Sequence, residues 1–174
     1  EVRERFVVQH KLTQAIREFL IDQDFIEVET PALQPLPGGA LANPFKTKYD
    51  ALDTYVYLRI APELYLKRLI IGGFERVFEF ARVFRNEGVS TQHLQDFTML
   101  EFYQAYATHE DLMKMTEKML SSVIKKVLGT TKVEIEGKKI DFKAPWPRRS
   151  FRDLIRGETG IDICLLYTSD AADE

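Results

Sequence analysis

Apolar and polar positions along the first third of the chain predict a helix, a strand and an irregular loop. Apolar residues recur at helical spacing from Val8 to Leu20, and this amphipathic pattern fades near residues 22–24. Residues 25–29 alternate apolar and acidic side chains, which is typical of a strand, and the strand should end at Thr30-Pro31 because proline cannot donate to a ladder. The segment that follows is rich in Pro and Gly, so its backbone can pass close to a ligand.

The rest of the pattern predicts two further helices, two hairpins and one more strand before a last short helix. Thr108 and Asp111 form a variant of the capping box, and Gly129 is a typical helix stop. The expected elements are, in order, a strand over 55–59, a helix that starts at Pro62 and ends near 72–73, an antiparallel hairpin of strands 76–84 and 97–107, a helix from Thr108 to Gly129, a small hairpin over 133–142 and a helix capped by Ser150. This order predicts an α+β fold with an antiparallel sheet.

Length and composition narrow the class of protein. With 174 residues, 45% of them hydrophobic, the chain suits one globular domain with a sizeable core. A net charge of −3 excludes a basic coat over the whole surface, and the single cysteine, Cys164, excludes an internal disulfide and a cysteine-cluster zinc site. There is no membrane-length apolar run and no signal peptide, so we expect a soluble, cytoplasmic protein with no membrane partner.

Candidate chemistry gathers in the long polar tip, residues 85–96, of the larger predicted hairpin. Arg85 offers a planar fork for a carboxylate or a phosphate, and Glu87 and His93 can orient a base or a ribose. Phe97, at the far foot of the tip, can stack on a ring. The plainer interpretations are that His93 is a solvent-exposed loop residue and that Phe97 belongs to the core; spacing alone favours them.

Odd-numbered residues of the second long strand share one face, which aligns Glu101 between Phe97 and Tyr103. This pattern predicts a carboxylate on the surface of a sheet. On spacing alone, a salt bridge from Glu101 to a neighbouring strand is the favoured interpretation. In the same way, Gly39 is on its own merely a turn residue.

Several sequence blocks, in the right order, resemble class II aminoacyl-tRNA synthetases. Residues 84–88 (Phe-Arg-Asn-Glu-Gly), with His93 and 97–103 (Phe-Thr-Met-Leu-Glu-Phe-Tyr), resemble motif 2 of that class, and residues 25–31 resemble motif 1. Residues 37–40 (Pro-Gly-Gly-Ala) and 58–69 (Leu-Arg-Ile-Ala-Pro-Glu-Leu-Tyr-Leu-Lys-Arg-Leu) are similar to the lysine-specific members, the lysyl-tRNA synthetases. The resemblance covers about residues 1–163 and is much more specific than one short motif.

The resemblance implies part of a class II catalytic domain, in which an antiparallel sheet is flanked by helices. It implies a two-step reaction in which lysine and ATP give lysyl-adenylate and the lysyl group then passes to tRNA(Lys). Mg²⁺ is expected for the full-length enzyme, but no metal ligand is assigned within this chain. Arg85 would be the catalytic residue and would bind the α-phosphate and the substrate carboxylate, while Glu87, His93 and Phe97 would bind the rest of ATP.

The family also implies a lysine site and a dimer. Gly39 would let the backbone approach a lysine amino group, and Glu63, Glu101 and Tyr103 would surround lysine with groups suited to ammonium ions. Two acids facing a cation would exclude an acidic substrate. Motif 1, which ends at Pro31, implies a homodimer interface.

The chain departs from the family in three respects. Gln92, Leu94 and Gln95 stand where many bacterial members have Arg, Asn and Pro. Motif 3, the magnesium carboxylates and the anticodon-binding barrel have no counterpart. Residues 164–174 resemble no continuation of the family, so we expect a partial catalytic domain over 1–163 and a non-native tail over 164–174, and we expect the chain to be inactive alone.

Two other functions fit the same residues. One is a related ligase that attaches lysine to elongation factor P, although residues 37–40 and 85–88 favour the synthetase. The other is a non-catalytic, synthetase-like binding module that lacks motif 3 naturally.

Overall fold

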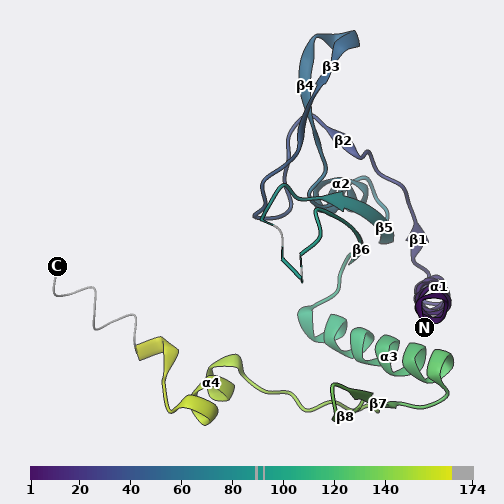
Figure 1. The fold of residues 1–174 in the computed structure, drawn as a ribbon, viewed down its shortest axis with the longest axis vertical. Coiled ribbons are helices and arrows are strands. Elements are labelled where there is room, and N and C mark those ends of the chain that lie inside the picture. The colour runs from purple at the N-terminus through teal and green to yellow at the C-terminus, as the bar shows by residue number, and fades with distance from the viewer. Residues whose placement is uncertain (89, 92, 166–174) are drawn as a thin grey trace.

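A computed structural model describes residues 1–88, 90–91 and 93–165 of the chain (Figure 1). The helices are α1 (Val2–Ile21), α2 (Glu63–Ile71), α3 (His109–Leu128), α4 (Phe151–Thr159) and the short 3-10 helix η1 (Asp50–Leu52). The strands are β1 (Ile26–Glu27), β2 (Leu33–Gln34), β3 (Lys46–Tyr49), β4 (Thr54–Leu58), β5 (Arg76–Phe84), β6 (Asp96–Gln104), β7 (Lys132–Ile135) and β8 (Lys138–Asp141).

The central sheet has the strand order β1-β5-β6. β5 and β6 pair antiparallel over nine residues, from Arg76 opposite Gln104 to Phe84 opposite Asp96, which confirms the predicted hairpin. β6 ends at Gln104 rather than at residue 107, because Tyr106 adopts a left-handed backbone conformation (φ +58°) that a strand cannot accommodate. β1 pairs parallel with β5, so the sheet is mixed.

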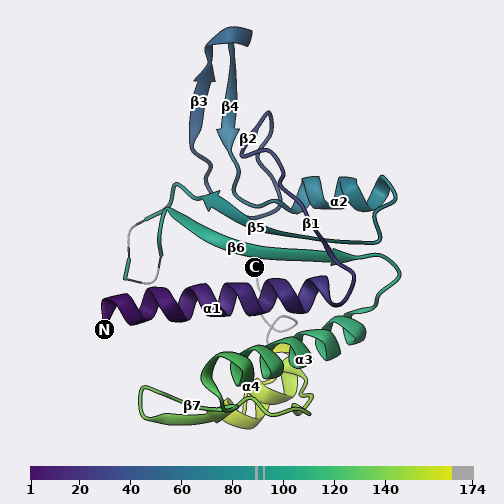
Figure 2. The same cartoon turned by 90° about the vertical axis from the view of Figure 1, so that its right-hand side faces the viewer.

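The two faces of the β5–β6 hairpin have different roles. The even-numbered face, which includes Phe78 and Phe102, packs against α1 and α3 and forms the main core with Leu20 and Met119. Figure 2 shows α1 and α3 on this side of the sheet and α2 on the opposite side. The odd-numbered face, with Glu101 on it, is therefore directed away from the main core, as the period of two predicts.

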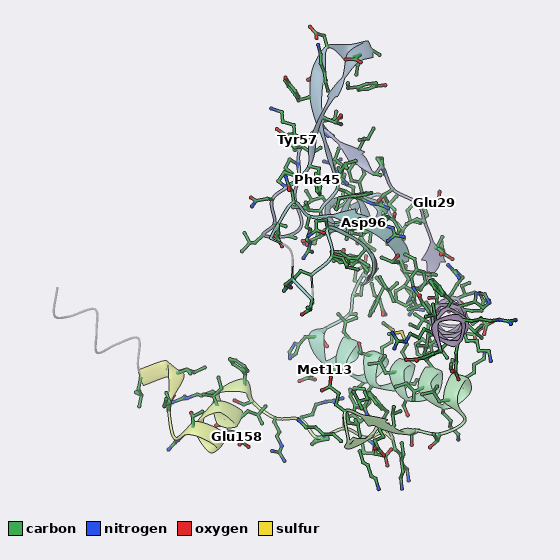
Figure 3. The ribbon with its side chains drawn as sticks, in the orientation of Figure 1. Glu29, Phe45, Tyr57, Asp96, Met113 and Glu158 are labelled. Atoms are coloured by element: carbon green, nitrogen blue, oxygen red, sulfur yellow. The ribbon has the colours of Figure 1, made fainter. Side chains whose placement is uncertain are left out.

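A second sheet forms an arm that projects from the central part of the molecule (Figure 1). Its strand order is β2-β4-β3, and all three strands pair antiparallel. The sequence pattern predicts β4 but not β2 or β3, since β2 has only two residues and all four residues of β3 are exposed. In Figure 3 the side chains crowd most densely around β5 and β6, whereas those of the arm extend outward.

Local signals explain where several elements begin and end. The Thr108 side chain accepts a hydrogen bond from the Asp111 N–H and Asp111 reciprocates, so the capping box that opens α3 is confirmed. Gly129 ends α3 with φ +75°. Pro62 is the N-cap of α2 and not its first helical residue. The strand expected over 25–29 is shorter than predicted and comprises only β1, although the Val28 N–H still donates to Phe78 O (2.9 Å).

Within the described ranges, none of the helices is long and apolar enough to cross a membrane.

Candidate functional site

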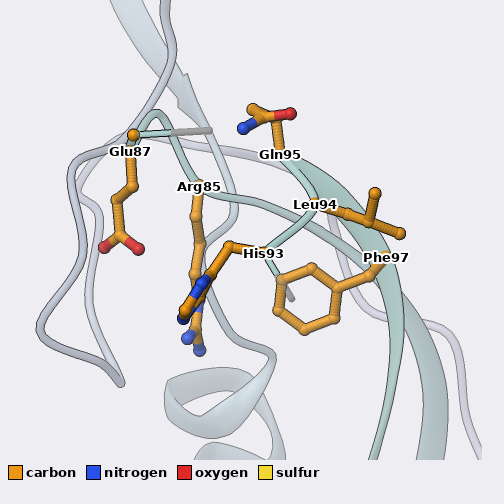
Figure 4. A pocket seen from close by; sticks show the side chains of 7 residues that line it. Arg85, Glu87, His93, Leu94, Gln95 and Phe97 are labelled. Carbon is orange, nitrogen blue, oxygen red and sulfur yellow. The ribbon is translucent and has the colours of Figure 1, made fainter. Parts of the chain in front are cut away.

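A pocket of about 260 Å³ lies at the end of the β5–β6 hairpin, where the polar tip joins the two strands. Its lining residues are Arg85, Glu87, Gly88, His93, Leu94, Gln95 and Phe97. All four residues that the sequence predicts for the ATP site are among them. In Figure 4, the side chains of Arg85, Glu87 and His93 run in the same direction, and the Phe97 ring lies on the neighbouring strand.

Contacts from two sides hold Arg85 in place. Its backbone N–H donates to Gln95 O (2.8 Å), which extends the β5–β6 ladder by one residue, and its Nε donates weakly to Ile60 O (3.4 Å). The guanidinium carbon lies 5.3 Å from the centre of the Phe97 ring. An aromatic face and a carbonyl thus orient a half-buried cation while its other N–H groups stay available for an anion.

The exposed tip has its own local order. A ring nitrogen of His93 and the Ser90 hydroxyl share a hydrogen bond of 2.7 Å. Val89 and Gln92 fall outside the described residues. The difference from the family at Gln92, where many members have Arg, therefore lies outside them too.

The four residues predicted to bind lysine form a second group. Glu63 is the first residue of α2, and an added Cβ at Gly39 (φ +89°) would lie 2.8 Å from its Cβ. No other residue type could adopt this conformation so close to the helix without a clash. On β6, the Tyr103 hydroxyl donates to Glu101 Oε2 (3.0 Å). Lys67, one turn along α2, forms an ion pair with Glu63.

Electrostatic effects link α2 to the sheet. Burial raises the pKa of the Glu101 carboxyl, and the negative charges of Glu63 and Glu79 raise it further, while the hydrogen bond from Tyr103 opposes them. Burial and the Glu101 charge raise the pKa of the Tyr103 hydroxyl. Half-buried acids that repel one another gain most from a bound cation.

The cross-strand salt bridge that spacing favours for Glu101 does not form. The residue directly opposite on β5 is Glu79, another acid. Glu79 is 2% exposed and pairs with Arg59, Nη1 to Oε1 at 2.6 Å, while the Thr30 hydroxyl donates to its other oxygen (2.6 Å). We did not predict this cluster; the signal available was an acid in the buried apolar stretch of β5.

Pro31 lies at the end of the motif-1 segment and is exposed. Of the expected tail, 164–174, only Cys164 and Leu165 lie within the described residues.

Among the residues that the structure describes, no group of three or more His, Cys, Asp or Glu side chains could hold a metal ion.

Comparisons with known proteins agree on one family. The family model for class II tRNA synthetases (D, K and N) matches residues 1–173. The chain is 52% identical over 172 residues to the lysine–tRNA ligase of Pelotomaculum thermopropionicum, which covers 99% of the chain and 34% of that ligase. It is 51% identical over 174 residues to the ligase of the same name from Clostridium novyi, covering 100% of the chain and 34% of the ligase.

A third relative, the lysine–tRNA ligase of Legionella pneumophila, is 55% identical over 153 residues, which is 88% of the chain and 31% of that ligase. The chain therefore spans about a third of the length of the curated relatives that it matches. Together with the α+β fold, these matches show that the chain belongs to the class II tRNA synthetase family of the D, K and N type.

Proposed function

We propose that the chain is part of the catalytic domain of a lysine–tRNA ligase, over residues 1–163, and that the complete enzyme activates lysine with ATP and transfers it to tRNA(Lys). The observation that carries this proposal is the juxtaposition of two sites at the β5–β6 hairpin: an arginine-aromatic pocket at its end and an acid pair, Glu63 and Glu101, beside it. The relatives named above support the choice of lysine.

In the first step, a carboxylate oxygen of lysine attacks the α-phosphorus of ATP, and pyrophosphate leaves to give lysyl-adenylate. Negative charge builds up on the phosphate oxygens in this step. Arg85 is positioned to bind both the α-phosphate and the lysine carboxylate, so it stabilises that charge and aligns the two reactants. No covalent bond to the enzyme is needed.

The rest of the pocket binds the nucleotide. Phe97 stacks on adenine, and Glu87 and His93 hold the adenine and phosphate end of ATP.

The acid pair selects the amino acid. Glu63, Glu101 and the Tyr103 hydroxyl face the ammonium groups of lysine, and Gly39 leaves room for the backbone to approach. An aspartate substrate would meet like charge at both acids, which costs binding energy and excludes it.

The complete protein also has partners. Motif 1, from β1 to Pro31, together with α1, forms the interface of a homodimer, and the activated lysine passes to the 3′ end of tRNA(Lys). Residues 164–174 are a non-native tail and take no part in the reaction.

The test is ATP–pyrophosphate exchange by the full-length protein that contains this segment, with each of the twenty amino acids in turn. We expect exchange with lysine and none with aspartate or asparagine. The 174-residue chain alone should bind lysine and ATP weakly and show no steady exchange. Steady lysine-dependent exchange by the chain alone would contradict its expected inactivity, but it would leave the lysine specificity of the full-length protein unaffected.

Two acceptors separate the proposal from its alternatives. Lysyl transfer to tRNA(Lys) supports the synthetase, whereas transfer to elongation factor P identifies the related ligase. A full-length protein that binds lysine and ATP but forms no adenylate is a binding module.

A further inference from the structure

The buried cluster of Thr30, Arg59 and Glu79 connects three segments of the chain that meet beside the site. Arg59 is 6% exposed and its side chain donates four hydrogen bonds to three residues: Nε donates to Arg82 O (2.8 Å), and Nη1 donates to Thr30 O (2.9 Å), Thr30 Oγ1 (3.2 Å) and Glu79 Oε1 (2.6 Å). The acceptors lie in two parts of the fold: Thr30 is at the end of motif 1, and Glu79 and Arg82 are at two positions along β5.

The backbone around Arg59 makes further connections. Its N–H donates to Ala32 O (2.8 Å), and its carbonyl accepts from the Phe84 N–H (2.9 Å). The carbonyl of the next residue, Ile60, accepts from Arg85 Nε. Arg59 therefore fixes the turn that leads from β4 to the start of α2, where Glu63 stands, against the end of β5, where Arg85 stands.

We propose that Arg59 is a positioning residue for lysine activation, which holds Arg85 and Glu63 in register and neutralises Glu79 directly across the sheet from Glu101. This inference rests on the proposed function. The side chain of Arg59 is almost fully buried and points into the β4–β5 junction, so its effect on the reaction passes through the residues that it orients.

The charge balance gives the cluster a second effect. The groups that face Glu101 are Glu63 and Lys67 on α2, Glu79 on β5 and Tyr103 on its own strand. The charges of Glu63 and Glu79 raise the pKa of Glu101, and the charge of Lys67 lowers it. Of these three groups, Glu79 is the buried one. The ion pair with Arg59 offsets part of the Glu79 charge, which favours the ionised form of Glu101 that accepts a cation.

The first test is Arg59→Lys in the full-length protein. A lysine keeps one positive charge near Glu79 but cannot reach Arg82 O and Thr30 O at the same time, because it lacks the planar fork. We expect the kcat of lysine-dependent ATP–pyrophosphate exchange to fall by about tenfold to a hundredfold, as for small misplacements of catalytic groups, with an unchanged pH profile. Arg68→Lys, the same replacement at an exposed position of α2, should leave exchange unchanged.

The second test separates charge from positioning. Glu79→Gln keeps an acceptor for Arg59 and removes the negative charge opposite Glu101, so the acid limb of kcat/KM for lysine should move to lower pH. A structural role alone would not move this limb.

The third test removes the pair while it preserves packing. In Arg59→Met/Glu79→Leu no buried charge is left unpaired, and such replacements are often neutral for stability. We expect thermal unfolding close to that of the wild type and exchange that stays as low as in Arg59→Lys.

Full exchange activity in the double variant, wild-type kcat in Arg59→Lys or an unmoved acid limb in Glu79→Gln would each overturn the inference. If the wild-type protein shows no exchange with lysine, the proposed function itself fails, and the inference fails with it. Active wild type with unaffected variants overturns the inference alone.

Discussion

The guanidinium carbon of Arg85 lies 5.3 Å from the centre of the Phe97 ring, and the two residues stand at the opposite feet of the loop that joins β5 to β6. The ring gives the cation a flat surface, and the Ile60 carbonyl fixes its rotation about the long axis. The hairpin itself therefore orients Arg85, the proposed catalytic residue, before any substrate arrives.

Replacement of Arg85 by lysine should reduce kcat of lysine-dependent ATP–pyrophosphate exchange by about a hundredfold or more, because one positioned donor to a developing negative charge contributes that much. The measurement is exchange by the full-length protein under saturating lysine and ATP. Arg82→Lys is the matched control, since Arg82 is an exposed residue of the same strand, and it should leave kcat within about twofold. Equal losses in both variants would contradict a specific role for Arg85.

Lysine binding should weaken as the pH falls, and the midpoint of this loss should lie above the ordinary pKa of a glutamate. Burial and the charges of Glu63 and Glu79 raise the pKa of Glu101, so this carboxylate is protonated, and loses its attraction for a cation, earlier on acidification than an exposed one. The measurement is the KM for lysine between about pH 5 and pH 8, the range in which folded proteins tend to be most stable. Glu101→Gln should raise KM and remove the pH dependence.

Removal of the Tyr103 hydroxyl should shift the acid limb that Glu101 controls in the direction opposite to the shift in Glu79→Gln. Tyr103→Phe removes the hydrogen bond that lowers the pKa of Glu101, so the acid limb should move to higher pH. The linked stability has the opposite sign to lysine binding: because the folded pKa of Glu101 is raised, its contribution to stability is present at low pH and is lost as the pH rises through that pKa. An acid limb that stays in place would show that another group controls lysine binding.

Gly39→Ala should raise the KM for lysine by about tenfold, because the added methyl group would lie 2.8 Å from the Glu63 Cβ and 3.1 Å from the Ala61 Cβ and would displace the start of α2. Gly73→Ala is the control: it has the same left-handed backbone (φ +100°) but open space around the added atom. It should lower the free energy of unfolding by about 1 kcal/mol through strain and leave KM unchanged. If both variants change KM alike, backbone strain is the cause and the contact with Glu63 is not.

Leu20→Ala should destabilise the fold by about 3 kcal/mol, since Leu20 is 0% exposed and packs in the core between α1 and the sheet. The next residue provides a control of similar size, because Ile21 is 51% exposed, and Ile21→Ala should cost about 1 kcal/mol or less. Urea unfolding followed by circular dichroism measures both. Similar losses would mean that α1 does not pack as described.

Elements with strong local signals could be predicted from the sequence. The capping box at Thr108, the stop at Gly129 and the two apolar runs of β5 and β6 act over a few residues, so the pattern contains them. The period of two also placed Glu101 and Tyr103 on one face. The family resemblance supplied four of the residues that line the pocket, Arg85 among them.

Long-range pairing could not be predicted. Arg59 and Glu79 are twenty positions apart, and no local pattern pairs them. They are buried together because the segment after β4 hydrogen-bonds to the end of β5, from the Phe84 N–H to Arg59 O. The strands β2 and β3 lack an alternating pattern, and β3 is held by its pairing with β4 alone. The approach of α2 to the sheet, which brings Glu63 near Glu101, is likewise a tertiary contact with no local signal.

Within the residues that the structure describes, β6 has a ladder partner on one side only, because the sheet runs β1-β5-β6. On its outer side, alternate residues of β6 turn their backbone N–H and C=O groups away from β5, which makes this edge a template for strand addition. A strand added at this edge would extend the surface beside Glu101 and Tyr103. The isolated chain, when concentrated, should associate through the same edge.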